Sequence, residues 1–307
     1  MTVTDSEIAS QPDVWARAAE RTDELAAVLR APGERILVVG CGTSAFMAAS
    51  IAALRESAGL GETDWNYPGE VPAGRRYDRV VALTRSGTTT EVDRLLADAP
   101  AARRCVITAV PDSPVARHAG SPDDVVVLDV ADEQSVVQTR FPTTVLRVAR
   151  EAFGEDVTHL DAQCRAAIAG PLPVDVTTID HLVYLGSGWT LGLAHEAALK
   201  VREAAQAWSE SYPALDYRHG PIAVAGPRSL VWTFGEPPAG LVADVEATGA
   251  TAFHDDLDPL VQLVLAQRVA TALAAHRGLD PDEPRHLTRS VVLAVPHETA
   301  PTNGAAR

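Results

Sequence analysis

The chain has 307 residues and a formal net charge of −15 at pH 7, and 46% of its residues are hydrophobic. The acidic charge disfavours nucleic acid and anionic membranes as partners. No apolar run approaches the ~18 residues of a membrane span. A chain of this length exceeds one typical core, so two domains of about 150 residues each are expected.

The start of the chain and its cysteines indicate where the protein resides. The first residues lack the basic and apolar segments of a secretory signal. Cys41, Cys105 and Cys164 are odd in number and lack the spacing of a metal site, which indicates reduced thiols. We therefore expect a cytoplasmic protein that uses no metal and no other cofactor.

The first half of the chain shows strands alternating with helices, after a helical segment over residues 1–30. "ILVVGCGTS" (36–44) predicts a strand and a Gly-rich turn, and the residues after it have helical spacing. "VVALTRSGTTTEVDRLLADA" (80–99) repeats strand, hydroxyl-rich turn and helix. Two more buried strands are expected at 103–110 and 123–130. A loop that runs into a long helix is expected at 136–153.

After a break near 167–175 the pattern begins again. "HLVYLGSGWT" (181–190) mirrors "ILVVGCGTS" and precedes a helix that carries Lys200. Further strands and a strongly apolar helix are expected at 228–236, 249–256 and 259–278. Cover for the apolar helix could come from a second subunit of a dimer or from the core of its own domain.

Alternating strands and helices indicate mostly parallel sheets that are covered on both faces. The predicted fold class is therefore α/β, with two tandem doubly wound parallel-sheet domains of the flavodoxin-like type. We place the first domain at 31–165, the second at 166–280, and a tail that closes the active site at 281–307.

Two turns occupy the expected ligand site, because ligands of such sheets bind beyond the carboxyl ends of the strands, near helix N-termini. "GCGTS" (40–44) and "TRSGTTTE" (84–91) combine glycine with hydroxyl groups, which suits a phosphate. Neither has a dinucleotide or nucleoside triphosphate motif. The alternative is that their hydroxyls only cap helices. The candidate ligands are Gly42, Thr43, Ser44, Thr84, Ser86 and Thr89.

Lys200 is the single lysine of the chain, against 25 arginines. Glu203 follows three residues later, so both side chains lie on one helix face. A compact ammonium could stabilise a developing enediolate and keep Glu203 ionised, and it can lose its proton when desolvated, as arginine cannot. The alternative is an ordinary solvated helix pair. The composition favours a catalytic pair with a titratable lysine.

Six stretches, in order along the chain, resemble the family of tandem sugar-isomerase (SIS) domain proteins, which includes the isomerase half of glucosamine-6-phosphate synthase. They are "EIASQP" (7–12), "CGTS" (41–44), "TRSGTTTE" (84–91), "EQSVVQTR" (133–140), "EAALKVRE" (196–203) with "HGP" (219–221), and "DEPRHLTRSV" (282–291). The resemblance implies a phosphosugar site built by the turns of the first domain and completed by the Lys200 helix and the "HGP" loop. It also implies substrate contacts from Val136 and Arg289.

His219 is the candidate for opening the sugar ring, because ring opening requires a group that titrates near neutral pH. The resemblance implies that His219 enters the site of a neighbouring subunit in a homodimer. The alternative is a loop histidine bonded to backbone. His195, His254 and His276 are interpreted as structural or exposed.

The chain departs from the synthase pattern at three places. Arg289 stands where the pattern has a lysine able to form an imine, and arginine stays protonated. Phe141-Pro142 replace an expected Ser-Phe, which we expect to alter substrate fit. Met1 is followed by Thr2 rather than by the nucleophilic cysteine of an amidotransferase domain, so ammonia from glutamine is not expected within this chain.

Two functional classes follow. The first is an enzyme acting on a hexose or hexosamine 6-phosphate: an aldose–ketose isomerase, or a deaminase or deglycase. Glu203 would move a proton between C1 and C2 with Lys200 as its electrostatic partner. The alternative is a phosphosugar-sensing regulator without catalysis. Such regulators usually carry a DNA-binding segment, for which the roughly 30 residues before the first strand are too short.

Overall fold

The computed structural model describes residues 1–99 and 103–293. It contains two sheets whose strand pairs are all parallel. The order is β2-β1-β3-β4-β5 in the first sheet and β7-β6-β8-β9 in the second. The strands of the first sheet are β1 (Ile36–Val39), β2 (Thr63–Asn66), β3 (Arg79–Thr84), β4 (Arg103–Thr108) and β5 (Val125–Val127). Those of the second are β6 (His181–Gly186), β7 (Trp208–Pro213), β8 (Ser229–Thr233) and β9 (Thr251–Phe253).

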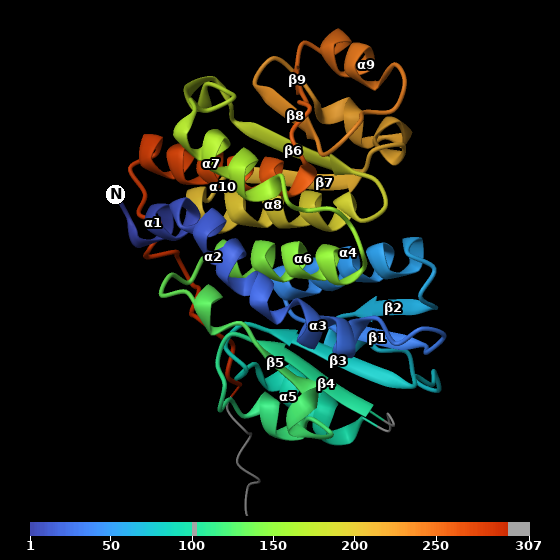
Figure 1. Cartoon of the computed structure of the whole chain (residues 1–307). Coiled ribbons are helices and arrows are strands. Elements are labelled where there is room, and N and C mark those ends of the chain that lie inside the picture. Colours follow the sequence, from blue (N-terminus) through green and yellow to red (C-terminus); the bar gives the residue numbers. More distant parts are fainter. Residues whose placement is uncertain (100–102, 294–307) are drawn as a thin grey trace, which may run out of the picture.

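Most helices lie between the two sheets (Figure 1). Those on the side of the first sheet are α2 (Gln11–Ala18), α3 (Thr22–Leu29), α4 (Thr43–Ser57) and α6 (Arg140–Ala152). Those on the side of the second are α1 (Val3–Ala9), α7 (Leu160–Ala169), α8 (Thr190–Ala205) and α10 (Pro259–His276). The outer faces of the sheets carry α5 (Thr90–Asp98) and α9 (Leu241–Ala247). The predicted α/β class with two parallel sheets is therefore confirmed.

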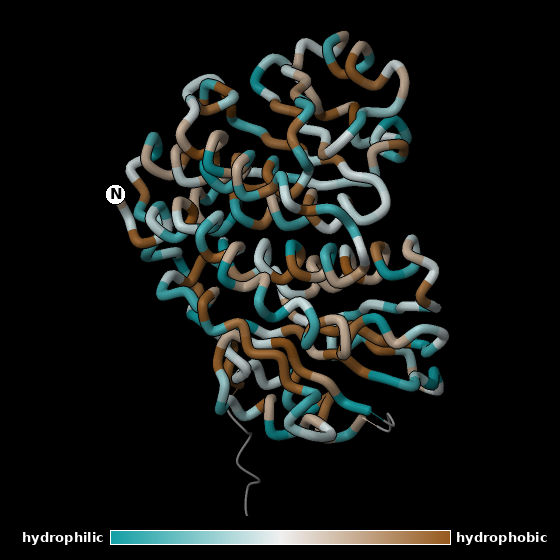
Figure 2. The backbone as a smooth tube through the Cα atoms, viewed as in Figure 1, coloured by the Kyte–Doolittle hydropathy of each residue, from teal (hydrophilic) through white to brown (hydrophobic). Residues whose placement is uncertain are grey.

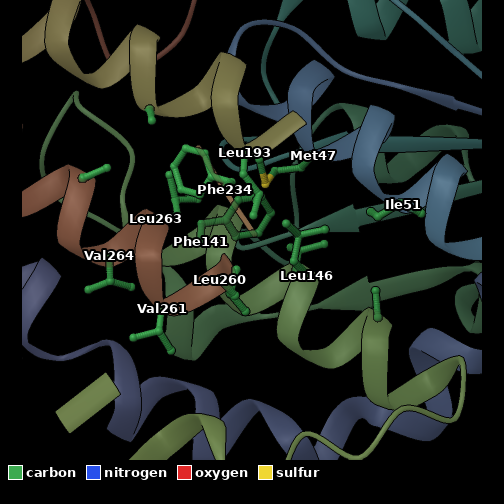
Figure 3. Close-up of a cluster of buried hydrophobic side chains, with 14 of the residues drawn as sticks. Met47, Ile51, Phe141, Leu146, Leu193, Phe234, Leu260, Val261, Leu263 and Val264 are labelled. Carbon is green, nitrogen blue, oxygen red and sulfur yellow. The ribbon is translucent and has the colours of Figure 1, made fainter. Parts of the chain in front are cut away.

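One hydrophobic core joins the two halves. Figure 2 shows hydrophobic residues along the strands of the first sheet and on the helices between the sheets. Met47 of α4, Phe141 of α6, Leu193 of α8 and Leu263 of α10 are all buried in the same cluster (Figure 3). Because helices from both sides contribute to this core, the position of α4 relative to α8 is fixed by packing.

The apolar helix α10 is covered within the chain. Thirteen of its residues are buried, and it packs on α8, α7 and α1. Burial inside the molecule, one of the two alternatives for this helix, is therefore confirmed. Across the described ranges, none of the helices has both the length and the apolar character needed to cross a membrane.

Phe141 has a structural role. Its side chain is 1% exposed and points into the shared core (Figure 3). A side chain buried among Met47 and Leu146 fills space between helices, and the effect of the Phe141-Pro142 pair on substrate fit stays a prediction.

Candidate active site

The turn "GCGTS" brings α4 close to the end of β1. A Cβ added at Gly40 would lie 2.6 Å from the backbone carbon of Ser44, so only glycine permits this approach. Gly42 has φ +53°, in the left-handed region, and directly precedes the helix. Thr43 and Ser44 are buried at the start of α4. The turn thus points the two hydroxyl side chains inward.

Lys200 lies at the centre of a buried cluster on α8. Its ammonium Nζ is 2.5 Å from Oε2 of Glu203 and 3.2 Å from Oε1 of Glu196, and it donates a 3.1 Å hydrogen bond to Oγ1 of Thr43. The side chain of Lys200 is 1% exposed. The alternative of a solvated helix pair was therefore wrong, because the pair is desolvated and bonded to a residue of the other half of the chain.

The charges of this cluster are strongly coupled. Burial alone lowers the pKa of Lys200, but the carboxylates of Glu196 and Glu203 outweigh burial, so the pKa is raised above its ordinary value. This direction favours the ammonium form of Lys200, and the titratable lysine stays a prediction. Burial raises the pKa of Glu196 to about 7, against the opposing effect of Lys200.

Glu203 is the member of the cluster that reaches a cavity. Its side chain is 19% exposed, while that of Glu196 is fully buried. The cavity has a volume of about 380 Å³ and is lined by the end of α8 and by residues of the tail, namely Leu199, Arg202, Glu203, Gln206, Ala207, Arg285, His286 and Leu287. A carboxylate at the wall of such a cavity can accept a proton from a bound molecule.

The second turn, "TRSGTTTE", closes on itself through its hydroxyl groups. Oγ1 of Thr84 accepts a hydrogen bond from the N–H of Gly87 at 3.2 Å, and Oγ of Ser86 accepts one from the N–H of Thr88 at 3.3 Å. Thr89 precedes α5 but makes no side-chain capping bond, and Gly42 before α4 has no hydroxyl to offer. The capping alternative was therefore wrong for Thr89, the residue at the capping position.

The tail lies across the start of α5. The N–H of Thr90 donates to the carbonyl of Val291 at 3.2 Å, and Oγ1 of Thr90 accepts from the N–H of Leu293 at 2.9 Å. The hydroxyls of Thr88 and Ser290 are 2.8 Å apart. The tail therefore runs from the Glu203 cavity to the second turn. Its last part, 294–307, falls outside the described residues.

Arg85 ties the tail to the loop that precedes α6. The buried guanidinium donates through Nη1 to the carbonyl of Ser135 at 2.8 Å and through Nη2 to the carbonyl of Arg289 at 2.7 Å. The Arg289 side chain pairs with Asp132 at 2.5 Å. Arg289 thus lies beside the second turn, with its guanidinium engaged by a carboxylate.

Two carboxylates shape the loop "EQSVVQTR". Oε1 of Glu7 accepts the N–H of Gln134 at 2.6 Å, and Oε1 of Glu133 accepts the N–H of Thr139 at 2.6 Å. Val136 lies half-buried between these anchors. The "EIASQP" stretch near the start of the chain therefore acts on this loop through the carboxylate of Glu7.

His219 is not brought to Glu203 within the chain. It lies exposed in the short turn Asp216–His219 after β7, with no side-chain hydrogen bond to any residue that the structure describes. His195 is structural, because its Nδ1 is 2.8 Å from Oγ of Ser211, while His254 and His276 are exposed. The interpretation of His195, His254 and His276 as structural or exposed is therefore confirmed.

Sequence reasoning missed Glu196, Arg285 and His286. Glu196 is the first letter of the "EAALKVRE" stretch and is four residues before Lys200, so helical spacing alone could have placed it in the cluster. Arg285 and His286 belong to the "DEPRHLTRSV" stretch, but their place beside Glu203 depends on the path of the tail. Within residues 1–99 and 103–293, no group of three or more His, Cys, Asp or Glu side chains is arranged to hold a metal ion.

Comparisons with known proteins show what the chain is similar to in sequence and fold. No family model matches the chain. The glutamine–fructose-6-phosphate aminotransferase [isomerizing] of Pyrobaculum aerophilum is 28% identical over 268 residues, covering 70% of this chain and 44% of that protein. The same enzyme of Gloeobacter violaceus is 26% identical over 85% of this chain and 52% of its own length. The chain thus spans about half the length of the curated relatives it matches.

Solved structures share the whole fold. The glucosamine-6-phosphate deaminase of Thermotoga maritima has a TM-score of 0.78 and 25% identity, covering 95% of this chain and all of that one. The C-terminal domain of the glucosamine-fructose-6-phosphate aminotransferase of Francisella tularensis has a TM-score of 0.76 at 20% identity, covering 92% and 98%. The tagatose-6-phosphate ketose/aldose isomerase of Escherichia coli has a TM-score of 0.73 at 21% identity, covering 97% and 98%.

The class follows from the fold and these comparisons. The chain has the tandem SIS fold of phosphosugar isomerases and deaminases, and its homologues are the isomerase half of glutamine–fructose-6-phosphate aminotransferases. The resemblance expected from the six stretches is therefore confirmed.

Proposed function

We propose that this chain is an enzyme that moves a proton between C1 and C2 of a hexose or hexosamine 6-phosphate, as an aldose–ketose isomerase or an aminosugar-phosphate deaminase. The observation that carries the proposal is Glu203 at the wall of the tail-lined cavity, with its carboxylate 2.5 Å from the buried Nζ of Lys200. A carboxylate beside a buried ammonium is suited to proton transfer next to a carbonyl, because the ammonium stabilises the oxyanion that develops.

The steps follow from the residues. The two turns and the start of α4 hold the phosphate and hydroxyls. Glu203 takes the proton from C2 of the open-chain aldose, and the electron pair of that C–H bond forms the C1–C2 double bond while the carbonyl electrons move to O1. Lys200 stabilises the resulting enediolate. A proton then moves from O2 to O1, and return of the carbon-bound proton to C1, as the electrons on O2 form the C2 carbonyl, gives the ketose. In this scheme Thr43, bonded to Lys200 at 3.1 Å, connects the first turn to the reacting carbons.

A deaminase shares the first half of this reaction. With an amino group at C2, transfer of the C2 proton to C1 and of one amino proton to O1 gives an imine at C2. Water then adds to that carbon and ammonia leaves. The Thermotoga maritima neighbour is a glucosamine-6-phosphate deaminase, which supports including amino sugars in the proposal. Arg289 forms no imine with the sugar, because its guanidinium stays protonated.

The proposal includes a homodimer in which His219 of one subunit opens the sugar ring in the site of its partner. Its support is that His219 is exposed and does not line the Glu203 cavity of its own chain. Co-expression of a Glu203→Gln chain with a His219→Asn chain tests the arrangement. An isologous dimer would regain roughly a quarter of the wild-type activity, because half of the dimers are mixed and each mixed dimer has one complete site. Action within one chain predicts no recovery.

Proton NMR in D₂O tests the reaction itself. The purified chain is incubated with glucosamine-6-phosphate, fructose-6-phosphate and other 6-phosphosugars, and released ammonia is assayed in parallel. Deuterium at C1 or C2 without ammonia identifies an isomerase, and deuterium with ammonia identifies a deaminase. Saturable binding without exchange for any sugar would overturn the enzyme proposal in favour of a phosphosugar sensor.

A further inference from the structure

A second cavity lies at the amino ends of the strands of the first sheet. The two turns lie at the opposite, carboxyl ends. The cavity is found at the amino ends of β1 and β3, whereas Gly42 and Thr84 follow the carboxyl ends. Its volume of about 410 Å³ is in the range of small-molecule sites. It is lined by Arg35, Leu37, Val71, Arg75, Arg76, Tyr77, Asp78, Val80, Leu95 and Ala99.

The cavity lies at the border of the small hydrophobic core on the outer face of this sheet, where Leu37 and Val80 are 1% and 3% exposed. Helix α5 has nine residues and is the α-helix that packs on this face. Leu37 and Val80 belong to the small core beneath α5, and Val71, Tyr77 and Leu95 border that core as half-buried side chains. The floor of the cavity is therefore apolar, and part of it remains accessible to a ligand.

The rim of the cavity carries three arginines and one aspartate, namely Arg35, Arg75, Arg76 and Asp78. Arg35 and Arg75 share one carboxylate, since Oδ2 of Asp64 is 3.2 Å from Nη2 of Arg35 and 2.9 Å from Nη1 of Arg75. Arg35 is also 3.4 Å from Glu62. Arg76 is exposed and has no ion pair within residues 1–99 and 103–293.

The carboxylate of Asp78, the one acidic side chain among the described residues that line the cavity, accepts a backbone hydrogen bond. Asp78 Oδ2 accepts a 2.8 Å hydrogen bond from the N–H of Arg35. The guanidinium of Arg35 lies 5.3 Å from the centre of the Tyr77 ring, which extends the flat wall of the cavity. Arg76 therefore provides a positive charge that no described carboxylate neutralises, in a chain whose net charge is −15.

We propose that this cavity is a second binding site, for a small anion with a flat apolar body such as an aromatic carboxylate. The ring would lie against Leu37, Val80 and Leu95, and the carboxylate would pair with Arg75 and Arg76, since guanidinium groups bind carboxylates in a planar, bidentate way. A phosphosugar fits poorly, because its hydroxyl groups would lose water against the apolar floor. The proposed site shares no residue with the Glu203 cavity, so it does not depend on the proposed function.

Methyl NMR of the full chain with 1-naphthoate as the probe tests this site. Labelled Val and Leu methyl groups report where the probe binds. Saturable shifts are expected at Val71, Val80 and Leu95, with the methyls of Leu199 in the Glu203 cavity unchanged. Arg76→Ala should weaken binding by about tenfold or more, because it removes a charged hydrogen-bond partner.

Two further variants sharpen the test. Arg17→Ala removes an exposed arginine of α2 that has no ion pair in the described part of the chain, and it should leave binding unchanged. Leu95→Trp fills the cavity and should abolish binding. Shifts centred on Leu199, or equal affinity of the wild type and Arg76→Ala, would overturn the proposal.

Discussion

The two strand–turn–helix units, β1–α4 and β6–α8, have the same local construction. A Cβ at Gly40 would lie 2.6 Å from the backbone of Ser44, and a Cβ at Gly186 would lie 2.3 Å from the carbonyl oxygen of Thr190. In both units a glycine at the end of the strand (Gly186) or directly after it (Gly40) therefore lets the following helix approach. Equal local sequence patterns have produced equal turns.

The side chains of the candidate active site, however, lie at different ends of the two helices. In the first unit Oγ1 of Thr43, at the start of α4, contacts the charged cluster. In the second unit Oγ1 of Thr190 accepts the N–H of Ser187 at 2.9 Å and donates to its carbonyl, so the turn is closed locally. The functional groups of α8 lie further along the helix, at Lys200 and Glu203. The repeated strand–turn–helix pattern thus determines the local fold of both units. The packing of α4 on α8 determines which residues of each unit lie in the candidate site.

Removal of Lys200 should have the largest effect on stability. Lys200→Met leaves the carboxylates of Glu196 and Glu203 without their shared ammonium, and breaking a buried ion pair costs about 3–5 kcal/mol. Urea unfolding measures this loss. Arg17→Met, which removes an exposed positive charge, is the control. Equal stability of Lys200→Met and the wild type would show that the cluster is not held by this charge.

The Glu196 carboxyl should make stability depend on pH. Its pKa of about 7 in the folded chain exceeds its ordinary value of 4.5, so the folded state binds more protons between these values. The unfolding free energy of the wild type relative to Glu196→Gln should therefore fall as pH rises from 5 to 7, by up to about 1.4 kcal/mol per unit, and level off above 8. Urea unfolding at each pH is the measurement. A difference that stays flat or rises would contradict the raised pKa.

The contact between α4 and α8 is tested at Gly192. A Cβ there would lie 2.2 Å from Oγ of Ser50 and 2.3 Å from the carbonyl oxygen of Phe46. Gly192→Ala should therefore separate the helices and cost about 1–3 kcal/mol of unfolding free energy. Gly69→Ala, where no atom lies within 4 Å of the added Cβ, is the matched control. A loss no greater than that of the control would show that the helices adjust freely.

Two threonines at the helix starts allow the units to be compared, although Thr190 occupies the position of Ser44 and Thr43 that of Trp189. Thr190→Val should lower stability by about 1 kcal/mol, because the N–H of Ser187 loses its acceptor, and should leave phosphosugar binding intact. Thr43→Val should weaken phosphosugar binding or turnover, since it removes a hydrogen bond to Lys200. Calorimetric titration and unfolding of both variants give the comparison. Equal effects on binding would mean that both turns contact the ligand.

The sequence predicted most of the fold but not its edges. The seven expected strands form, and most of them are buried apolar runs, although β9 (Thr251–Phe253) is exposed or half-buried. β2 (Thr63–Asn66) and β7 (Trp208–Pro213) were not expected. They are polar edge strands, "TDWN" and "WSESYP", and such strands have the composition of loops. Pairing with β1 and β6 defines them, and pairing partners cannot be read from so short a segment.

The site was predictable where its geometry is local. The spacing of Lys200 and Glu203 placed both on one face of α8, and the structure joins them at 2.5 Å. The direction of the pKa shift of Lys200 could not be predicted, because the charges of Glu196 and Glu203 oppose the burial of the ammonium. The contact between Thr90 and Val291 could not be predicted either, because it requires the tail to return across the whole molecule.

The most direct test of the central claim is the rate of deuterium exchange into a 6-phosphosugar in D₂O for the wild type, Glu203→Gln and Glu246→Gln. Glu246 is an exposed carboxylate of α9 and provides the matched control. If Glu203 is the base, its variant should lose on the order of 10²–10⁴-fold in rate, while Glu246→Gln exchanges like the wild type. Exchange that persists at the wild-type rate in Glu203→Gln would contradict the account.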